Sequence, residues 1–315
     1  MLNNKMEHPE YFFWAAALTA LFLPTGAPAP ARASDPELEA AASPAAPQLH
    51  PFQEMTLRAK AAYVYDVKAG RALFSKDAAT VFPLASLTKL MTAALALTLL
   101  PETTLIPIEK AAIEQEGDSK LQIGERWLLR DLAAFMLLES SNDAAYAIAA
   151  YAGSVSLGAE DRVLGREFFV EKMNERAVLW KLDATRFYNE TGLDLQSGEA
   201  GALSSAKDVA HLLARALRLF PSVFGKTRLR ELPLLNGDGD ARPARNTNKE
   251  TDALPLLIAS KTGYTDLAGG NLAVAFDVGF NRPLIVVVLG STIDGRFSDV
   301  EKLVWAALAY LTYNQ

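Results

Sequence analysis

Hydrophobic and polar positions follow two different periods along the chain, and the change from one to the other separates its regions. Residues 61–67 and 71–75 carry β-branched and aromatic side chains on either side of a short turn, which predicts a β-hairpin. From Ser86 to about Leu219, apolar residues instead recur every three or four positions, which predicts a block of helices.

Strand-like segments return in the last quarter of the chain. They cover Leu256 to Lys261, Asn271 to Val278 and Leu284 to Leu289, and the last contains an unbroken apolar run expected to be buried on both faces. A capping box at Ser298–Glu301 predicts a closing helix that packs on the sheet. Strands at both ends with helices between them predict an α/β (α+β) fold, in which one antiparallel sheet is built from both chain ends around an inserted helical subdomain.

The N-terminal segment has the layout of an export signal. A polar stretch precedes the 13-residue apolar run 11–23, which is too short to span a bilayer, and small residues around Ala33 suit cleavage. We therefore expect a signal peptide at 1–33, an Ala/Pro-rich linker at 34–55 and a catalytic domain at 56–315. The protein is expected to be exported, periplasmic or extracytoplasmic, and tethered to the membrane through its N-terminus only if the signal is kept.

The net charge and the counts of cysteine and histidine exclude several kinds of partner and catalytic site. With 31 Lys and Arg against 37 Asp and Glu, the net charge of −6 argues against a nucleic-acid partner. The chain has no cysteine, which excludes disulfides, thiol nucleophiles and thiolate metal sites. It has three histidines, of which His8 and His50 precede the expected domain, so we expect no metal or other cofactor and a catalytic base other than histidine.

Ser86 and Lys89 form the first candidate site. A serine at the start of a helix lies in the positive end of the helix dipole, and a lysine three residues later shares its face. The apolar helix that follows is expected to desolvate Lys89 and lower its pKa, as an amine base requires. Ser204 and Lys207 have the same spacing, but there we expect helix caps and a solvated polar face that includes His211.

Two further motifs accompany the first site. Ser140-Ser141-Asn142 falls between two predicted helices, the second of them capped by Asp143, and Lys261-Thr262-Gly263 lies on a predicted strand. There the lysine and the hydroxyl can hold a carboxylate, and Gly263 lets a substrate backbone approach.

The order of these motifs matches the Ser-x-x-Lys, Ser-x-Asn and Lys-Thr-Gly set of penicillin-binding enzymes. The sequence from about residue 58 to 313 resembles the D-alanyl-D-alanine carboxypeptidases, the low-molecular-weight penicillin-binding proteins. Segments that carry the resemblance are PLASLTKLMT, IGERWLLRDLAAFMLLESSNDAA, FVEKMNERA, SSAKDVAHLLARA, NTNK, KTGYTDLAGG and RFSDVEKL. The resemblance implies a β-lactamase/transpeptidase-like fold and a serine peptidase that removes the terminal D-alanine from peptidoglycan stem peptides through an acyl-enzyme.

The resemblance also implies catalytic roles. Ser86 would form the acyl-ester, Lys89 would take its proton, and Ser140 would relay a proton to the leaving amine. β-Lactams would then be covalent inhibitors of Ser86, and peptidoglycan stem peptides its substrates.

Substrate-binding roles follow from the same resemblance. Asn142 would bind the substrate amide, while Lys261 and Thr262 would hold the terminal carboxylate, with Gly263 beside them. The oxyanion would lie between the backbone N–H groups of the nucleophile and Tyr264.

Departures from the family pattern leave alternatives open. Glu139-Ser140-Ser141-Asn142 stands where many relatives have Pro-Ser-Gly-Asn, and the sequence given lacks the family's C-terminal β-rich domain and amphipathic helix, so a D,D-endopeptidase that cuts cross-links is one alternative. A class A-like β-lactamase is another, although its Glu-x-x-Leu-Asn string is absent. A third alternative is a non-catalytic penicillin-sensing or penicillin-binding domain.

Overall fold

The computed structural model describes residues 51–313, except 54, 118–119, 197 and 280. The expected signal peptide and nearly all of the expected linker lie outside the described residues. Phe52, near the end of the expected linker, is buried and stacks on Phe74 with ring centroids 5.3 Å apart. No helix in the described part of the chain has the length and apolarity needed to cross a membrane.

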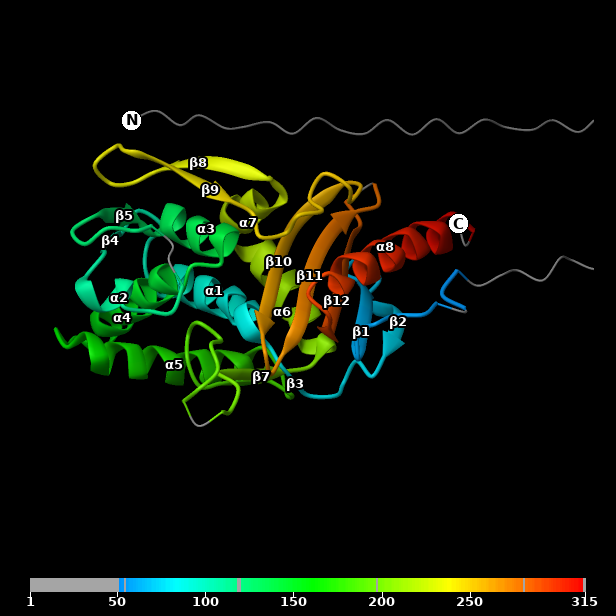
Figure 1. The fold of residues 1–315 in the computed structure, drawn as a ribbon, viewed down its shortest axis with the longest axis horizontal. Coiled ribbons are helices and arrows are strands. Elements are labelled where there is room, and N and C mark those ends of the chain that lie inside the picture. Colours follow the sequence, from blue (N-terminus) through cyan, green and yellow to red (C-terminus); the bar gives the residue numbers. More distant parts are fainter. Residues whose placement is uncertain (1–50, 54, 118–119, 197, 280, 314–315) are drawn as a thin grey trace, which may run out of the picture. The chain divides into compact units, whose positions relative to one another are not determined.

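A five-stranded antiparallel sheet confirms the prediction that both chain ends build one sheet (Figure 1). The strand order is β10-β11-β12-β1-β2, so the first hairpin lies at one edge and the strand that carries Lys261 at the other. The strands are β1 (Ala61–Asp66), β2 (Arg71–Lys76), β10 (Leu257–Thr265), β11 (Gly269–Asp277) and β12 (Pro283–Ser291). β10 extends four residues beyond its predicted end and carries the whole Lys-Thr-Gly motif.

Both faces of the sheet are covered by helices. Alternate residues of β12 point to opposite faces, so Ile285 and Val287 join one core cluster while Val286 joins the other. Helix α6 (Ala206–Leu219) packs on the first face and α8 (Gly295–Tyr313) on the second. This confirms the prediction that the apolar run of β12 is buried on both faces.

The start of α8 differs from the prediction. The helix begins at Gly295 rather than at the capping box, and the Ser298 hydroxyl donates to the carbonyl oxygen of Gly295 at 3.0 Å instead of capping the helix. The carboxylate of Asp299 is fully buried and accepts hydrogen bonds from the backbone N–H of Arg58 at 3.0 Å and from that of Ala59 at 2.7 Å. Asp299 therefore ties α8 to the segment that enters β1.

The region between β2 and β10 is mainly helical, as predicted, with short strands that the periodicity did not reveal. Besides α6, its helices are η1 (Ala85–Thr88), α1 (Lys89–Leu99), α2 (Lys110–Ile113), α3 (Leu129–Glu139), α4 (Asn142–Leu157), α5 (Arg162–Leu179), α7 (Pro221–Phe224) and η2 (Gly225–Arg228). The short strands pair as β3 (Phe82–Pro83) with β7 (Ala202–Ser204), β7 with β6 (Arg186–Phe187), β4 (Leu105–Pro107) with β5 (Arg126–Leu128), and β8 (Glu231–Leu235) with β9 (Ala241–Arg245).

Candidate active site

Ser86 lies in the tight 3₁₀ turn η1, just before α1 begins at Lys89. The preceding residue, Ala85, has a φ of 49°, a left-handed value that few non-glycine residues adopt. Gly192 permits this turn, since a Cβ at that position would lie 2.0 Å from the carbonyl oxygen of Ala85. Ser86 remains partly exposed, so its hydroxyl is accessible at the start of a helix, as the sequence predicted.

Lys89 is fully buried, and its ammonium nitrogen is surrounded by oxygen atoms. Nζ lies 3.0 Å from Ser86 Oγ, 2.6 Å from Asn142 Oδ1 and 2.7 Å from the carbonyl oxygen of Thr191. Burial lowers the pKa of Lys89 to about 7, and the negative charge of Glu190 only partly opposes the shift. Near neutral pH, a large fraction of Lys89 is therefore an uncharged amine within reach of the Ser86 hydroxyl.

The junction of α3 and α4 forms the second wall of the site. Ser140 ends α3 with a φ of 60°, and Ser141 caps α4 by accepting a hydrogen bond from the Ala144 N–H at 3.0 Å. The prediction that Asp143 caps this helix is wrong, because α4 starts at Asn142 and Asp143 lies within its first turn. The two serines thus turn the chain so that Asn142 faces Lys89.

Both ends of the Asn142 side-chain amide contact the protein. Its Oδ1 accepts from Lys89, and its Nδ2 donates to the carbonyl oxygen of Glu116 at 2.6 Å. These contacts position the lysine, in addition to the substrate-binding role that the resemblance implies for Asn142.

Lys261, on β10, faces the same space from the sheet. Its Nζ donates to Ser140 Oγ at 2.8 Å and to the carbonyl oxygen of Thr262 at 2.9 Å. Burial lowers the pKa of Lys261 well below its usual value, and the positive charges of Lys89 and Arg296 lower it further. A carboxylate placed beside Lys261 would offset this unfavourable burial of charge, so the position suits an anionic substrate group.

Thr262 extends the same polar surface. Its hydroxyl lies 2.6 Å from the hydroxyl of Thr247, which follows β9. Thr247 belongs to the NTNK segment, and the sequence predicted no role for it. The contact places a second hydroxyl next to the predicted carboxylate site.

Gly263 also has a packing role that the sequence did not predict. A Cβ at this position would lie 2.8 Å from the carbonyl oxygen of Leu84 and 3.2 Å from the backbone nitrogen of Ser86. The glycine therefore lets β10 pack directly against the nucleophile turn. The next residue along β10, Tyr264, has an exposed side chain.

Arg296, in the first turn of α8, binds the peptide group that joins Gly263 to Tyr264. Its Nη1 donates to the carbonyl oxygen of Gly263 at 2.7 Å, and its guanidinium lies 4.8 Å from the centre of the Phe297 ring. The Gly263 carbonyl and the Tyr264 N–H belong to one planar peptide group. Arg296 thus fixes the direction in which the Tyr264 N–H points, a contact that sequence reasoning missed.

Asn271, on β11, is a second residue that sequence reasoning missed. Its side chain is fully buried, and Nδ2 donates to the carbonyl oxygens of Pro83 at 2.9 Å and Leu84 at 3.1 Å. It anchors the segment that leads to Ser86 onto the sheet. An isolated asparagine inside an apolar strand is the only signal of this role in the sequence.

The second Ser-x-x-Lys copy lies outside the site, as predicted. Ser205 caps α6 by accepting from the Asp208 N–H at 3.1 Å, and Lys207 is exposed. His211 is less solvated than expected, because it is half-buried, its ring packs 4.8 Å from that of Tyr65 and burial lowers its pKa.

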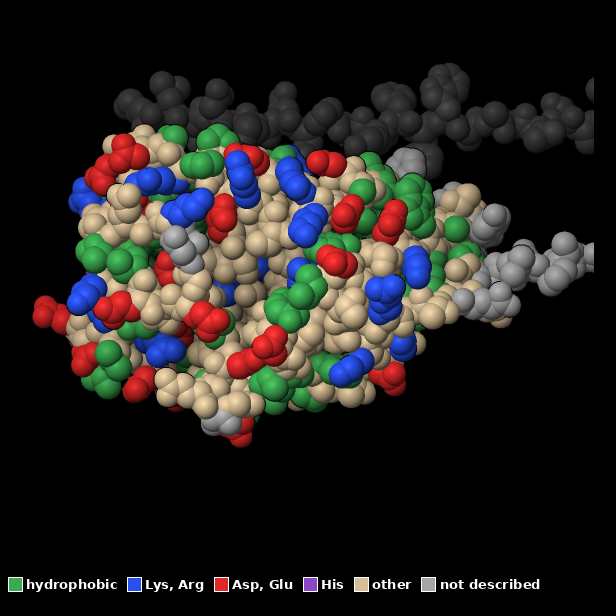
Figure 2. Space-filling view, in the orientation of Figure 1, with side chains coloured by type: hydrophobic (Ala, Val, Ile, Leu, Met, Phe, Trp, Pro, Cys, Tyr) green, Lys and Arg blue, Asp and Glu red, His purple; other side chains and the backbone are tan. Residues whose placement is uncertain are grey.

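The arrangement of these side chains has the chemistry expected of a nucleophile next to an anion-binding surface. A hydroxyl beside a partly neutral amine supplies a nucleophile and a base, and a second hydroxyl bonded to a buried cation supplies a proton path and charge. Figure 2 shows that this face of the molecule is hollowed near its middle, with lysine or arginine side chains inside the hollow and along its edge near β9. In the described part of the chain, no group of three or more His, Cys, Asp or Glu side chains is arranged to hold a metal ion.

Comparisons with known proteins agree with this geometry. The D-alanyl-D-alanine carboxypeptidase family model matches residues 46–292. A D-alanyl-D-alanine carboxypeptidase of Bacillus subtilis is 29% identical over 79% of this chain and 62% of its own length. A D-alanyl-D-alanine endopeptidase of Pseudomonas aeruginosa is 31% identical over 76% of this chain and 73% of its own length.

Solved structures share the fold. The Streptomyces K15 DD-transpeptidase superposes with a TM-score of 0.71 at 26% identity, covering 81% of this chain and 98% of its own. Penicillin-binding protein D2 of Listeria monocytogenes, in its cefotaxime-bound form, superposes with a TM-score of 0.66 at 29% identity, covering 80% and 98%. The fold predicted from the sequence is therefore confirmed.

Proposed function

This chain belongs to the D-alanyl-D-alanine carboxypeptidase family, and from that premise we propose that it is an exported serine D,D-peptidase that removes the terminal D-alanine from peptidoglycan stem peptides. The observation that carries the proposal is the buried Lys89, whose pKa is lowered to about 7 and whose Nζ lies 3.0 Å from Ser86 Oγ. The chain spans 62% of the length of the Bacillus relative, so the activity is proposed from the site itself as well as from the likeness.

Acylation uses the helical side of the site. Neutral Lys89 takes the hydroxyl proton of Ser86 while Oγ attacks the carbonyl carbon of the penultimate D-alanine. The oxygen of that carbonyl becomes an oxyanion beside the backbone N–H groups of Ser86 and Tyr264. The close packing of Gly263 on the Ser86 turn supports this assignment of the two N–H groups.

The strand side of the site holds the leaving residue. Lys261, Thr262 and Thr247 bind its carboxylate, since their polar atoms converge next to Ser140. The C–N bond breaks, and the leaving amine receives a proton through the Ser140 hydroxyl. The acyl-ester on Ser86 remains, and the free D-alanine departs.

Water then hydrolyses the ester, with Lys89 as the base. Glu190, the carboxylate that acts electrostatically on Lys89, is bound by Arg166, whose Nε lies 2.9 Å from each of its oxygens. This carboxylate is engaged by arginine rather than directed at the ester. We therefore expect an acyl-enzyme formed from a β-lactam to persist, so that β-lactams act as inhibitors.

Mass analysis of the products from a pentapeptide that ends in D-Ala-D-Ala tests the proposal. The expected product is the tetrapeptide plus one alanine, together with stoichiometric labelling by a fluorescent penicillin. A protein that neither shortens the pentapeptide nor is labelled would contradict the proposal, and rapid turnover of benzylpenicillin would favour a β-lactamase.

A further inference from the structure

A cavity of about 820 Å³ lies between α6 and the face of the sheet that α6 covers. Its floor contains Tyr65 of β1, Ile258 of β10 and Ile285 of β12, and its wall contains Ala214 and Leu217 of α6. The volume falls within the range of about 300–1,000 Å³ that is usual for small-molecule sites. We call this space the α6–sheet cavity.

The α6–sheet cavity is separate from the catalytic groups. Of the strand that carries Lys261, it includes Ile258, which lies three residues earlier, roughly 10 Å along an extended chain. None of the catalytic and substrate-binding residues predicted from the sequence lines it. A ligand in this cavity would therefore leave Ser86 accessible.

The floor of the cavity offers apolar surface rather than hydrogen-bonding groups. Tyr65 and Ile258 are partly buried hydrophobic residues that pack against the core. β1 and β12 each pair with a strand on both sides, so their backbone groups are already hydrogen-bonded. A peptide bound there would leave its own N–H and C=O groups without partners, whereas an alkyl chain has no such groups. The floor therefore suits an alkyl chain.

Positive charge lies along the side of the cavity formed by α6 and η2. Arg218 and Arg228 are exposed, and neither has an ion-pair partner among the described residues. The carboxylate in the lining, Asp277, already accepts hydrogen bonds from the backbone N–H of Gly279 at 2.9 Å and from that of Arg282 at 3.1 Å. The two free guanidinium groups favour an anionic head group on the ligand.

His211 adds a polar atom without a partner to the lining. Its ring packs on Tyr65, and its Nε2 is buried with no hydrogen-bond partner in the described part of the chain. Arg215, one turn further along α6, is engaged instead, because its Nη1 donates to the carbonyl oxygen of Trp180. A buried polar atom without a partner is unfavourable, and a ligand oxygen in the cavity would supply one.

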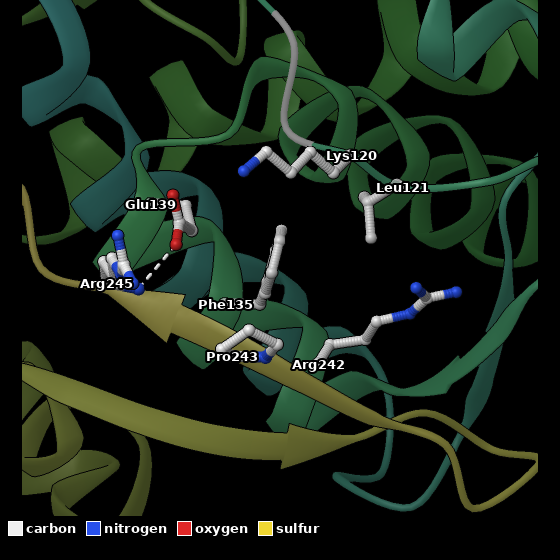
Figure 3. A pocket seen from close by; sticks show the side chains of 7 residues that line it. All are labelled: Lys120, Leu121, Phe135, Glu139, Arg242, Pro243 and Arg245. Atoms are coloured by element: carbon white, nitrogen blue, oxygen red, sulfur yellow. Dashed lines mark hydrogen bonds between the residues drawn. The ribbon is translucent and has the colours of Figure 1, made fainter.

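A second cavity, between α3 and β9, has its charges arranged differently (Figure 3). Its volume is about 240 Å³, and both arginines in its lining have carboxylate partners, Arg242 with Glu125 and Arg245 with Glu231. The α6–sheet cavity is larger and has arginines without such partners. The comparison favours the α6–sheet cavity as the place for an anion.

We propose that the α6–sheet cavity binds a single-chain amphiphile with a carboxylate head group, such as a medium-chain fatty acid. The alkyl chain lies on the apolar floor, and the carboxylate contacts Arg218 and Arg228. The binding is non-covalent. It goes beyond the proposed D,D-peptidase activity and does not depend on it.

Isothermal titration calorimetry with decanoate tests the inference, together with two probes that each lack one half of the required chemistry. Decanoate should bind at one molecule per chain. Decylammonium has the same alkyl chain with the opposite charge and should bind about tenfold more weakly or worse, while acetate, which has the charge without the chain, should give no measurable binding. No binding of decanoate, or equal affinity for decanoate and decylammonium, would overturn the inference.

A surface variant tests the head-group contacts. Arg218→Gln/Arg228→Gln should raise the Kd for decanoate about tenfold, through the loss of two charge contacts, and both side chains are exposed, so the variant should fold. Arg58→Gln/Lys60→Gln removes two exposed positive charges before the opposite end of β1 and is the matched control. An unchanged Kd in the first variant, or an equal change in the control, would overturn the inference.

A cavity-filling variant tests the place of the alkyl chain. Ala214→Phe puts a ring into the cavity and should raise the Kd for decanoate more than tenfold, with cooperative thermal unfolding as the check that the variant is folded. Wild-type affinity in this variant would show that decanoate binds elsewhere and would overturn the inference. Penicillin labelling and pentapeptide cleavage report on the proposed function alone, so its failure is distinguishable from a failure of decanoate binding.

Discussion

The two Ser-x-x-Lys copies of this chain have opposite environments. In the first, Ser86 is partly exposed and Lys89 is fully buried. In the second, the Ser204 side chain is 1% exposed while Lys207 lies in solvent. A nucleophile needs an accessible hydroxyl and a desolvated amine, and only the first copy supplies both.

The partners of each serine explain the difference. Ser86 Oγ has the Lys89 amine as a neighbour, whereas Ser204 Oγ lies 2.7 Å from the hydroxyl of Thr185. The next serine, Ser205, caps α6. The same Ser-x-x-Lys spacing is therefore suited to reactivity at Ser86 and to helix stability at Ser204 and Ser205. The burial of the lysine distinguishes the two copies.

The largest expected effect is on covalent labelling. Ser86→Ala should abolish labelling by a fluorescent penicillin, because it removes the atom that forms the ester. Ser204→Ala should retain full labelling in the same gel assay. Label remaining on Ser86→Ala would show that another side chain is the nucleophile.

Lys89→Met should have the second-largest effect, on the rate of acylation. Loss of the base should slow acylation by about 10²–10⁴-fold, the usual range for general-base catalysis. Lys207→Met is the matched control, and its stopped-flow labelling rate should stay within about twofold of wild type. Comparable losses in the two variants would break the distinction between the copies.

Arg296 should affect only the Ser86 copy of the motif, because it binds β10, the strand that packs against the Ser86 turn. Arg296→Met should slow acylation about tenfold, less than the 10²–10³-fold typical for direct loss of an oxyanion donor. It should also move the alkaline limb of the pH profile upward, since its charge lowers the pKa of Lys261. Arg282→Met, which breaks the ion pair with Asp66 at 2.7 Å, should leave the pH profile unchanged.

The pH dependence of acylation reports on the buried amine. Lys89 acts only in its neutral form, so the acidic limb of the profile should rise with pH through about 7, before the alkaline limb on which Lys261 loses its charge. At pH 6, about one tenth of a lysine with that pKa is neutral, so the rate should be roughly a tenth of the value expected when Lys89 is fully neutral. A profile that rises only near pH 10, the range of a solvated lysine, would show that the base is not desolvated.

These contrasts also show which parts of the fold and of the site could be predicted from the sequence. The sheet and the helical block were predictable because their periods are local, and the first motif stood out because two other motifs accompany it. Arg296, Asn271 and Thr247 were not predictable, since each acts on a residue that is distant along the chain. The α8 boundary was missed because Thr292 accepts a hydrogen bond from the Gly295 N–H, so the helix starts three residues before the predicted capping box.

The smallest expected effect concerns stability. Ser205→Ala should lower the free energy of unfolding by about 1 kcal/mol, because it leaves the Asp208 N–H at the start of α6 without its cap. Ser86→Ala should cost less, since no side-chain cap hydrogen bond supports its turn. Urea unfolding measures both, and Ser205→Asp, which keeps an acceptor at the cap, should restore most of the loss. If Ser86→Ala were the more destabilising change, the reactive serine would also be a structural one, and the division of roles between the two copies would fail.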